Sequence, residues 1–160
     1  MGSITDRKGL CVPWSHRPTA SNLELQPQLF SKIGFEQMGL CRVAVLVVED
    51  EALVRMGIVD FLDEHGFEVF EAESADDAIA ILGSTPRIAI MFTDVDMPGG
   101  MDGLKLAAAV RHRWPPIKIV VTSGHRQVNL DDLPVEARFF AKPYNPHEIV
   151  TTMRQMSRSN

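Results

Sequence analysis

The sequence predicts an α/β fold in which a five-stranded parallel sheet is doubly wound, with helices on both faces. From Arg42 onward, short apolar or β-branched runs alternate with segments of helical periodicity five times. Strands that alternate with helices form parallel sheets with right-handed crossovers. Residues 88–94 are almost entirely apolar up to a final aspartate, as expected of a strand that is buried on both faces.

The first part of this pattern contains two strands and a helix. Residues 43–48 form a β-branched run that predicts the first strand. The next residues, through His65, carry apolar side chains on one helical face, and Gly66 follows where a left-handed residue commonly ends a helix. Residues 67–72 alternate apolar and polar side chains, which predicts a strand near an edge of the sheet.

The middle of the chain continues the alternation. Ser74 is followed three residues later by Asp77, a spacing that resembles a capping box and predicts a helix over residues 75–82. Residues 88–94 are the central strand. Residues 104–112 form the third helix, which ends before a Trp-Pro-Pro sequence.

The last part supplies two more strands and a final helix. Residues 117–122 and 137–141 are the fourth and fifth strands, and residues 146–157 form the last helix. Residues 126–134 lie between these strands and have only a weak helical pattern that includes Pro134. We therefore expect the fourth helix to be shortened or irregular.

Composition and pattern divide the chain into two parts. Apolar residues make up 45% and charged residues 23% of the 160 residues, so a packed core is expected. Residues 1–40 show neither helical nor strand periodicity, which predicts a disordered or loosely docked extension before one domain over residues 41–160. Cys11 and Cys41 do not have metal-like spacing, and we expect reduced thiols.

The charge pattern argues against some classes of partner. The net charge is −5 without any long run of like charges, which disfavours nucleic acid as the main partner. No apolar run approaches the roughly 20 residues of a membrane span, and the N-terminus lacks the apolar core of a secretion signal. The sequence predicts a soluble, cytoplasmic protein without a membrane span.

Chemically notable residues stand at the C-terminal ends of four of the predicted strands. They are Glu49 and Asp50 after the first, Asp94 at the third, Thr122 and Ser123 at the fourth, and Lys142 after the fifth. In a doubly wound sheet of strand order 2-1-3-4-5 these four strands are contiguous, and ligands bind where the strand order reverses. The sequence therefore predicts that these side chains converge on one shallow pocket.

Four motifs at these strand ends resemble the receiver domain of two-component response regulators. They are VVEDE at residues 47–51, FTDVDMPGGMDG at 92–103, VTSG at 121–124 and FFAKPY at 139–144. Together they place the resemblance over residues 42 to about 157. The resemblance implies a flavodoxin-like domain that is phosphorylated on Asp94 by a phosphohistidine donor and requires Mg²⁺.

The resemblance also assigns roles that fit the chemistry of the residues. Mg²⁺ binds carboxylate and other oxygen ligands. The implied ligands are Asp50, Asp94, the backbone carbonyl of Asp96 and Glu49, the last bound directly or through water. Three crowded acids repel one another, which is a physical reason to expect a cation among them. Lys142 supplies a positive charge that pairs with Asp94 at rest and with the phosphoryl group afterwards.

Two further positions complete the implied site. Ser123 donates a hydrogen bond to a phosphoryl oxygen, with Thr122 as the alternative; we prefer Ser123 because the small Gly124 follows it. Phe139 resembles the switch aromatic of the family, and its alternative role is that of an ordinary core residue. His125 borders the site and is a candidate for influencing dephosphorylation by orienting water.

The expected partner is a histidine kinase or a histidine phosphotransferase, docked near the first helix, where Met56 and Val59 are candidate apolar contacts. The chain would then act on an unknown output protein or in a phosphorelay, because no DNA-binding domain is expected after the last helix. Two other hypotheses about the function stay open. One is a receiver-fold binding module that is independent of phosphorylation, and the other is a phosphatase of the haloacid dehalogenase type, whose Asp-x-Asp motif Asp94 and Asp96 match superficially.

Overall fold

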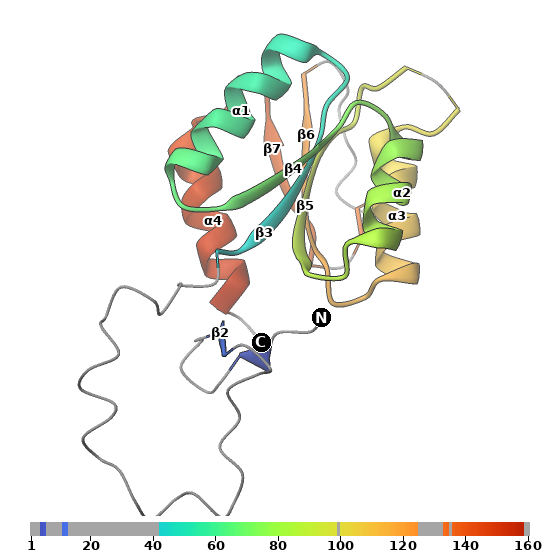
Figure 1. Cartoon of the computed structure of the whole chain (residues 1–160). Coiled ribbons are helices and arrows are strands. Elements are labelled where there is room, and N and C mark those ends of the chain that lie inside the picture. The colour runs from blue at the N-terminus through green and yellow to red at the C-terminus, as the bar shows by residue number, and fades with distance from the viewer. Residues whose placement is uncertain are drawn as a thin grey trace, which may run out of the picture. The chain divides into compact units, whose positions relative to one another are not determined.

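Figure 1 shows the computed structural model of the chain. The structure describes residues 4–5, 11–12, 42–98, 100–124, 133–134 and 136–158. The chain divides into two compact units, Met1–Arg42 and Val43–Asn160. In the first unit, β1 (Ile4–Thr5) and β2 (Cys11–Val12) pair antiparallel. The sequence pattern did not predict these strands, because two residues are too few for an alternation to be visible.

The second unit is built on a five-stranded sheet in which all neighbouring strands are parallel. Its strands are β3 (Ala44–Val48), β4 (Glu68–Ala72), β5 (Ile88–Asp94), β6 (Lys118–Ser123) and β7 (Arg138–Ala141). Their spatial order is β4-β3-β5-β6-β7. This order confirms the predicted 2-1-3-4-5 topology, and it confirms that residues 67–72 belong to an edge strand.

Helices cover both faces of this sheet, as predicted. They are α1 (Ala52–Glu64), α2 (Ala75–Ser84), α3 (Gly103–Arg113) and α4 (Pro146–Arg158). Figure 1 shows α1 and α4 on one face and α2 and α3 on the other. The predicted central strand 88–94 has the observed bounds, and the ends of the other predicted elements lie within two residues of the observed ones. Most of the predicted irregular helix over residues 126–134 lies outside the described residues.

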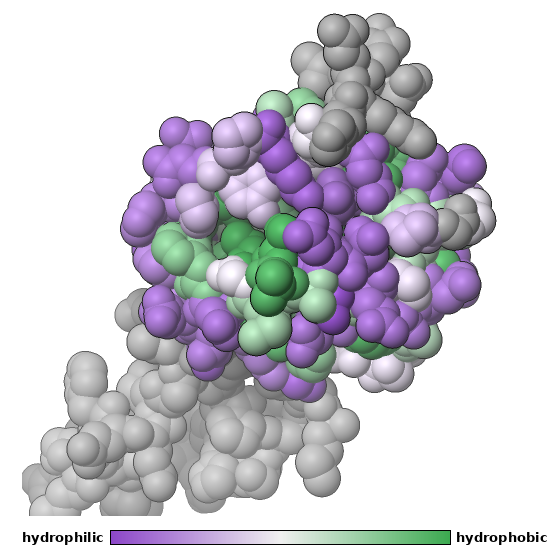
Figure 2. All heavy atoms as spheres, turned by 90° about the horizontal axis from the view of Figure 1, so that it is seen from above, coloured by the Kyte–Doolittle hydropathy of each residue, from purple (hydrophilic) through white to green (hydrophobic). Residues whose placement is uncertain are grey.

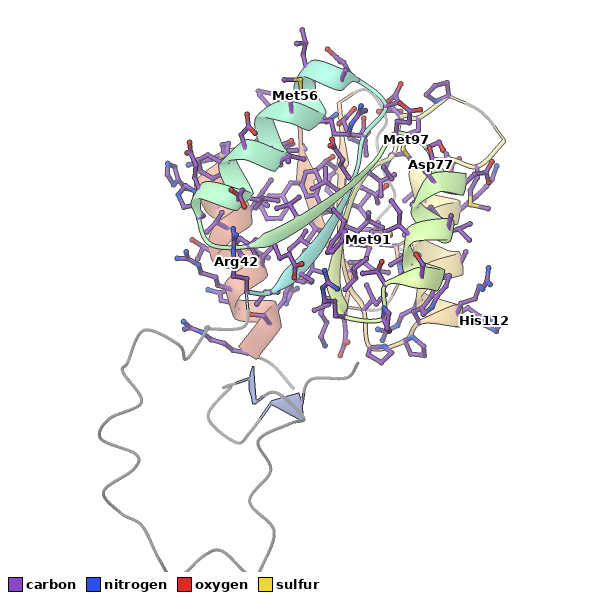
Figure 3. All side chains as sticks on the ribbon, viewed as in Figure 1. Arg42, Met56, Asp77, Met91, Met97 and His112 are labelled. Carbon is purple, nitrogen blue, oxygen red and sulfur yellow. The ribbon has the colours of Figure 1, made fainter. Side chains whose placement is uncertain are left out.

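Each face of the sheet carries its own hydrophobic core. Between the sheet and α1 and α4, the buried residues include Val47, Ile58, Leu62, Phe92 and Met153. Between the sheet and α2 and α3, they include Leu46, Leu82, Met91, Leu106 and Val121. Figure 3 shows Met91 in this second layer. No helix in the described part of the chain is long and apolar enough to cross a membrane.

The helix ends agree with the sequence signals. Gly66 has φ +84°, the left-handed conformation predicted after α1. The Ser74 hydroxyl oxygen accepts a hydrogen bond from the N–H of Asp77 at 3.2 Å, as in a capping box. In a full capping box the second side chain also accepts a hydrogen bond from the backbone N–H of the cap residue. Here the Asp77 carboxylate instead accepts from the Ser74 hydroxyl at 2.6 Å. Asp102 caps α3 by accepting from the N–H of Lys105 at 2.9 Å.

Apolar side chains are exposed near the beginning of α1. In the described part of the chain, the exposed large hydrophobic residues are Leu53 and Met56. Figure 2 views the domain from the end at which Met56 and Met97 lie in Figure 3, and it shows hydrophobic residues surrounded by hydrophilic ones. Val59 instead packs partly against the core. Of the two predicted apolar contacts, Met56 is therefore exposed, whereas Val59 is partly buried against the core of the domain.

Gly103 allows α3 to begin directly against the end of β5. A Cβ atom at Gly103 would lie 2.7 Å from the carbonyl carbon of Asp94 and 2.9 Å from the Cα of Val95, and closer still to the Asp94 carbonyl oxygen. The N–H of Gly103 also donates to the Val95 carbonyl at 3.2 Å. These neighbours are backbone atoms and cannot swing aside, so the position requires glycine.

We predict that Gly103→Ala lowers the free energy of unfolding by about 2 kcal/mol, because the overpacked backbone has to shift. The matched control is Gly57→Ala within α1, where the added Cβ would meet nothing within 4 Å beyond its chain neighbours and the backbone of its own helix. This control should gain about 0.5–1 kcal/mol, since alanine is favoured in a helix. Urea unfolding measures both variants. Equal effects of the two substitutions would contradict the close approach of α3 to β5.

Candidate functional site

The sheet brings the predicted site residues to one edge. Glu49 and Asp50 directly follow β3, and Asp94 is the last residue of β5. Ser123 ends β6, and Lys142 directly follows β7. Because β3, β5, β6 and β7 are neighbours in this order, their C-terminal ends form one continuous edge. The predicted convergence of these strand ends is therefore present in the structure.

Lys142 joins two of the carboxylates at the centre of this edge. Its Nζ donates to Asp94 Oδ2 at 2.8 Å and to Glu49 Oε2 at 2.9 Å. The Glu49 and Asp94 side chains are only 2% and 6% exposed, whereas that of Lys142 is 24% exposed. The contact with Asp94 was predicted. The contact with Glu49 was not, because sequence spacing does not reveal which acid a long side chain reaches.

The acids lie close enough together to share a cation. Glu49, Asp50 and Asp94 each offer a carboxylate oxygen, and these oxygens all lie within 4.8 Å of one another. Asp94 Oδ1 is buried and has no hydrogen-bond partner among the described residues. An unpaired buried carboxylate oxygen is costly, and a hard divalent cation would satisfy it with ligands of the preferred kind. The donor set therefore fits a divalent cation at this edge.

The charges at this edge shift the pKa values of both groups that flank Asp94. Burial raises the pKa of Glu49, and the negative charge of Asp94 adds to this effect, while the hydrogen bond from Lys142 opposes it. Burial lowers the pKa of Lys142, but its hydrogen bonds to Asp94 and Glu49 outweigh that cost, so its net pKa is raised. Lys142 therefore stays protonated at neutral pH.

The two candidate hydroxyl groups have different surroundings. The Ser123 hydroxyl donates to Asp96 Oδ2 at 2.9 Å, so it faces the loop that follows β5. The Thr122 hydroxyl is buried and donates to the Thr93 backbone carbonyl at 3.5 Å. Ser123 is thus the hydroxyl that contacts another site residue, and this favours it over Thr122. The role predicted for the Asp96 backbone carbonyl stays a prediction.

Two other predicted positions flank the site. Phe139 in β7 is partly buried and packs against the core on the α2 and α3 side. This position is compatible with both predicted roles, switch aromatic and core residue. His125 lies outside the described residues.

Arg55 is a site neighbour that sequence reasoning missed. Its guanidinium group donates to the backbone carbonyl of Glu49 at 2.7 Å and to that of Asp50 at 3.5 Å. The sequence signal that was available is the position of Arg55, five residues after Asp50 and near the start of the predicted helix. Without the path of the backbone between β3 and α1, that spacing did not distinguish Arg55 from a solvent-exposed arginine.

Comparison with known proteins adds a family and several relatives. A family model described as the response regulator receiver domain matches residues 45–154. The sensor kinase CckA of Brucella abortus is 37% identical over 116 residues, which cover 70% of this chain and 12% of that protein. The hydrogenase transcriptional regulatory protein HoxA of Cupriavidus necator is 34% identical over 120 residues, which cover 71% and 24%, respectively. The chain spans less than a quarter of these two relatives.

Two solved structures match this chain over nearly their whole lengths. The crystal structure of a response regulator receiver protein from Sinorhizobium medicae has a TM-score of 0.70 and 26% identity, and the match covers 75% of this chain and 98% of that one. A receiver protein from Pseudomonas putida has a TM-score of 0.63 and 28% identity, with 71% and 97% covered. These neighbours confirm the predicted fold.

We predict that Lys142→Met lowers the free energy of unfolding by about 3 kcal/mol at neutral pH, because it leaves two buried carboxylates without their cation. The matched control is Lys105→Met. Lys105 is 67% exposed and lies 3.9 Å from Asp102, so its removal should change stability by less than about 0.5 kcal/mol. Urea unfolding measures both variants. Unchanged stability of Lys142→Met would refute the role of Lys142 as the compensating charge.

The same loss of stability should shrink as the pH falls from neutral toward the ordinary pKa range of a glutamate. Glu49 has a raised pKa in the folded state, and the loss of Lys142 raises it further. A carboxyl group whose pKa is higher in the folded than in the unfolded protein binds its proton at a higher pH when the protein is folded. Between the folded and the unfolded pKa, a fall in pH therefore increases the free energy of unfolding, and it does so more for Lys142→Met than for wild type.

Proposed function

Because this chain belongs to the response regulator receiver domain family, we propose that it accepts a phosphoryl group on Asp94 from a phosphohistidine donor in a Mg²⁺-dependent reaction. The single observation that carries this proposal is the placement of Asp94. It ends the central strand, lies 2.8 Å from Lys142 and shares an acidic cluster with Glu49 and Asp50. Family membership makes the chain a signalling domain rather than a classical enzyme.

In the proposed reaction, a carboxylate oxygen of Asp94 attacks the phosphorus atom of the donor. A phosphorus–oxygen bond forms, the phosphorus–nitrogen bond to the donor histidine breaks, and the histidine nitrogen keeps the electron pair. Asp94 suits this role because it is the last residue of β5, where the sheet holds it in place. Positioning of the nucleophile is a large part of catalysis in phosphoryl transfer.

Other residues of the site would stabilise the charge that builds on the phosphoryl oxygens. Lys142 already lies against Asp94 and would contact the transferred group. Ser123 would exchange its hydrogen bond to Asp96 for one to a phosphoryl oxygen. The residues that would hold Mg²⁺ are Glu49, Asp50, Asp94 and the backbone carbonyl of Asp96. When bound, Mg²⁺ neutralises charge on the phosphoryl oxygens.

The signal would pass through a shift between two conformations. A phosphoryl group adds nearly two negative charges at Asp94, and it favours the conformation in which Ser123 and Lys142 contact it. Lys142 directly follows β7, and Phe139 lies within β7, so this shift would change the surface around β6 and β7. The proposed input partner is a histidine kinase or a histidine phosphotransferase, and the output partner would recognise the changed surface.

We predict that wild-type protein, incubated with Mg²⁺ and a small acyl phosphate, gains one labile phosphoryl adduct that intact mass spectrometry detects. Asp94→Asn should gain none, because an amide is a poor nucleophile, and a chelator should abolish the adduct. The control Asp60→Asn changes an exposed acid of α1 away from the cluster and should react like wild type. No adduct on folded wild-type protein would instead support a binding module that ignores phosphate.

We further predict that Ser123→Ala slows accumulation of the adduct about tenfold, the effect expected from losing one hydrogen bond to a charged group. Thr122→Val should stay within about twofold of wild type, because its hydroxyl makes only a long contact to a backbone carbonyl. The measurement is the fraction of phosphorylated protein against time. The reverse order of effects would assign the hydroxyl role to Thr122.

A further inference from the structure

We propose that Arg55 is the positioning residue of the Mg²⁺ site, because its guanidinium group fixes the loop that carries Glu49 and Asp50. This inference rests on the proposed function and extends it to a residue outside the predicted ligands. Arg55 lies on the first turns of α1, and its side chain is 15% exposed. It therefore belongs to the packed structure rather than to the solvated surface.

The loop between β3 and α1 lacks the usual means of fixing a helix start. The described structure has side-chain caps at α2 and α3, provided by Ser74 and Asp102, whereas Glu51 at the start of α1 makes no side-chain cap bond. No acidic residue lies in the first turn of α1. A helix end without a cap leaves the preceding loop less constrained.

Arg55 supplies the missing constraint from within the helix. Its Nη1 atom donates to the Glu49 carbonyl at 2.7 Å, with a longer contact of 3.5 Å to the Asp50 carbonyl. Its Nε atom donates to Glu71 Oε2 at 3.3 Å, and Glu71 belongs to β4, the neighbour of β3. The planar guanidinium group thus ties the loop to an adjacent strand through two separate nitrogen atoms, where a lysine would offer only one.

The other end of Glu49 is already fixed. Its carboxylate accepts from Lys142 at 2.9 Å and from the N–H of Glu51 at 3.4 Å. With Arg55 on the carbonyl and Lys142 on the carboxylate, both the backbone and the side chain of this predicted ligand are held. Residues that hold metal ligands in place commonly change metal affinity by 10- to 100-fold when they are replaced.

Two effects of Arg55 on the cation have opposite signs, and this makes the inference testable. As a positive charge near the site, Arg55 would repel Mg²⁺, so Arg55→Met would bind Mg²⁺ more tightly if charge alone mattered. If Arg55 instead acts by positioning the loop, Arg55→Met would bind Mg²⁺ more weakly than wild type. Arg55→Lys separates the two effects, because lysine keeps the charge but has one nitrogen atom where Arg55 uses Nη1 for the loop carbonyls and Nε for Glu71.

The experiment measures the Mg²⁺ dissociation constant of the full chain by isothermal titration calorimetry. We expect Arg55→Lys and Arg55→Met both to raise it about tenfold. The matched control is Arg87→Met, which removes another arginine–glutamate pair, with Glu68, away from the site. The control should stay within about twofold of wild type. Circular dichroism in the same buffer establishes that each variant is folded.

Three outcomes would overturn the inference. The first is that Arg55→Met binds Mg²⁺ more tightly than wild type while Arg55→Lys binds it equally well. The second is that both variants bind Mg²⁺ as wild type does. The third is that wild-type protein binds no Mg²⁺. Phosphorylation is measured separately by intact mass at saturating Mg²⁺. If wild-type protein binds Mg²⁺ but takes no phosphoryl group, the proposed function fails, while the binding data still decide the role of Arg55.

Discussion

The contacts of Lys142 with Asp94 and Glu49 are the interaction on which the functional edge of this domain depends. Two carboxylates with almost no exposure lie at the ends of neighbouring strands, and their burial is tolerable only beside a cation. Lys142 lies at the end of β7, two strands away from β5, and its backbone N–H is anchored by the Ser123 carbonyl at 2.9 Å. The ion contacts therefore require the full strand order, and the packing of the sheet fixes the chemistry of its edge.

The lysine compensates the acids only in part. One oxygen of Asp94 has no hydrogen-bond partner among the described residues, and burial raises the pKa of Glu49 despite the nearby ammonium group. The folded domain thus holds excess negative charge in a small volume. Such a site is poised for a second, divalent cation, and the proposed dependence on Mg²⁺ follows from this imbalance.

Local patterns predicted the elements of the domain because each pattern reports a local cause. Buried parallel strands require continuous apolar runs, and Gly66 was recognisable because α1 ends in a left-handed residue. The grouping of Asp94, Ser123 and Lys142 at one edge could be predicted because the strand order places the C-terminal ends of their strands side by side. The contacts that the sequence did not reveal depend on close approaches between distant segments. They include the Lys142 contact with Glu49, the Arg55 contact with the same residue and the lack of space at Gly103.

The contact between Ser123 and Asp96 shows how small the energetic basis of a switch at this site can be. At rest, the Ser123 hydroxyl bonds to the Asp96 carboxylate at 2.9 Å. Under the proposed chemistry, the phosphoryl group competes for this hydroxyl, so one charged acceptor replaces another. A hydrogen bond to a charged group contributes about 1.5–3 kcal/mol, and the exchange leaves only a fraction of that as net driving force. In the proposed phosphorylated state Lys142 would also gain a more negative partner, and it directly follows β7, the strand that contains Phe139. The two contacts together would therefore supply more bias than either alone, and both would act through the same edge of the sheet.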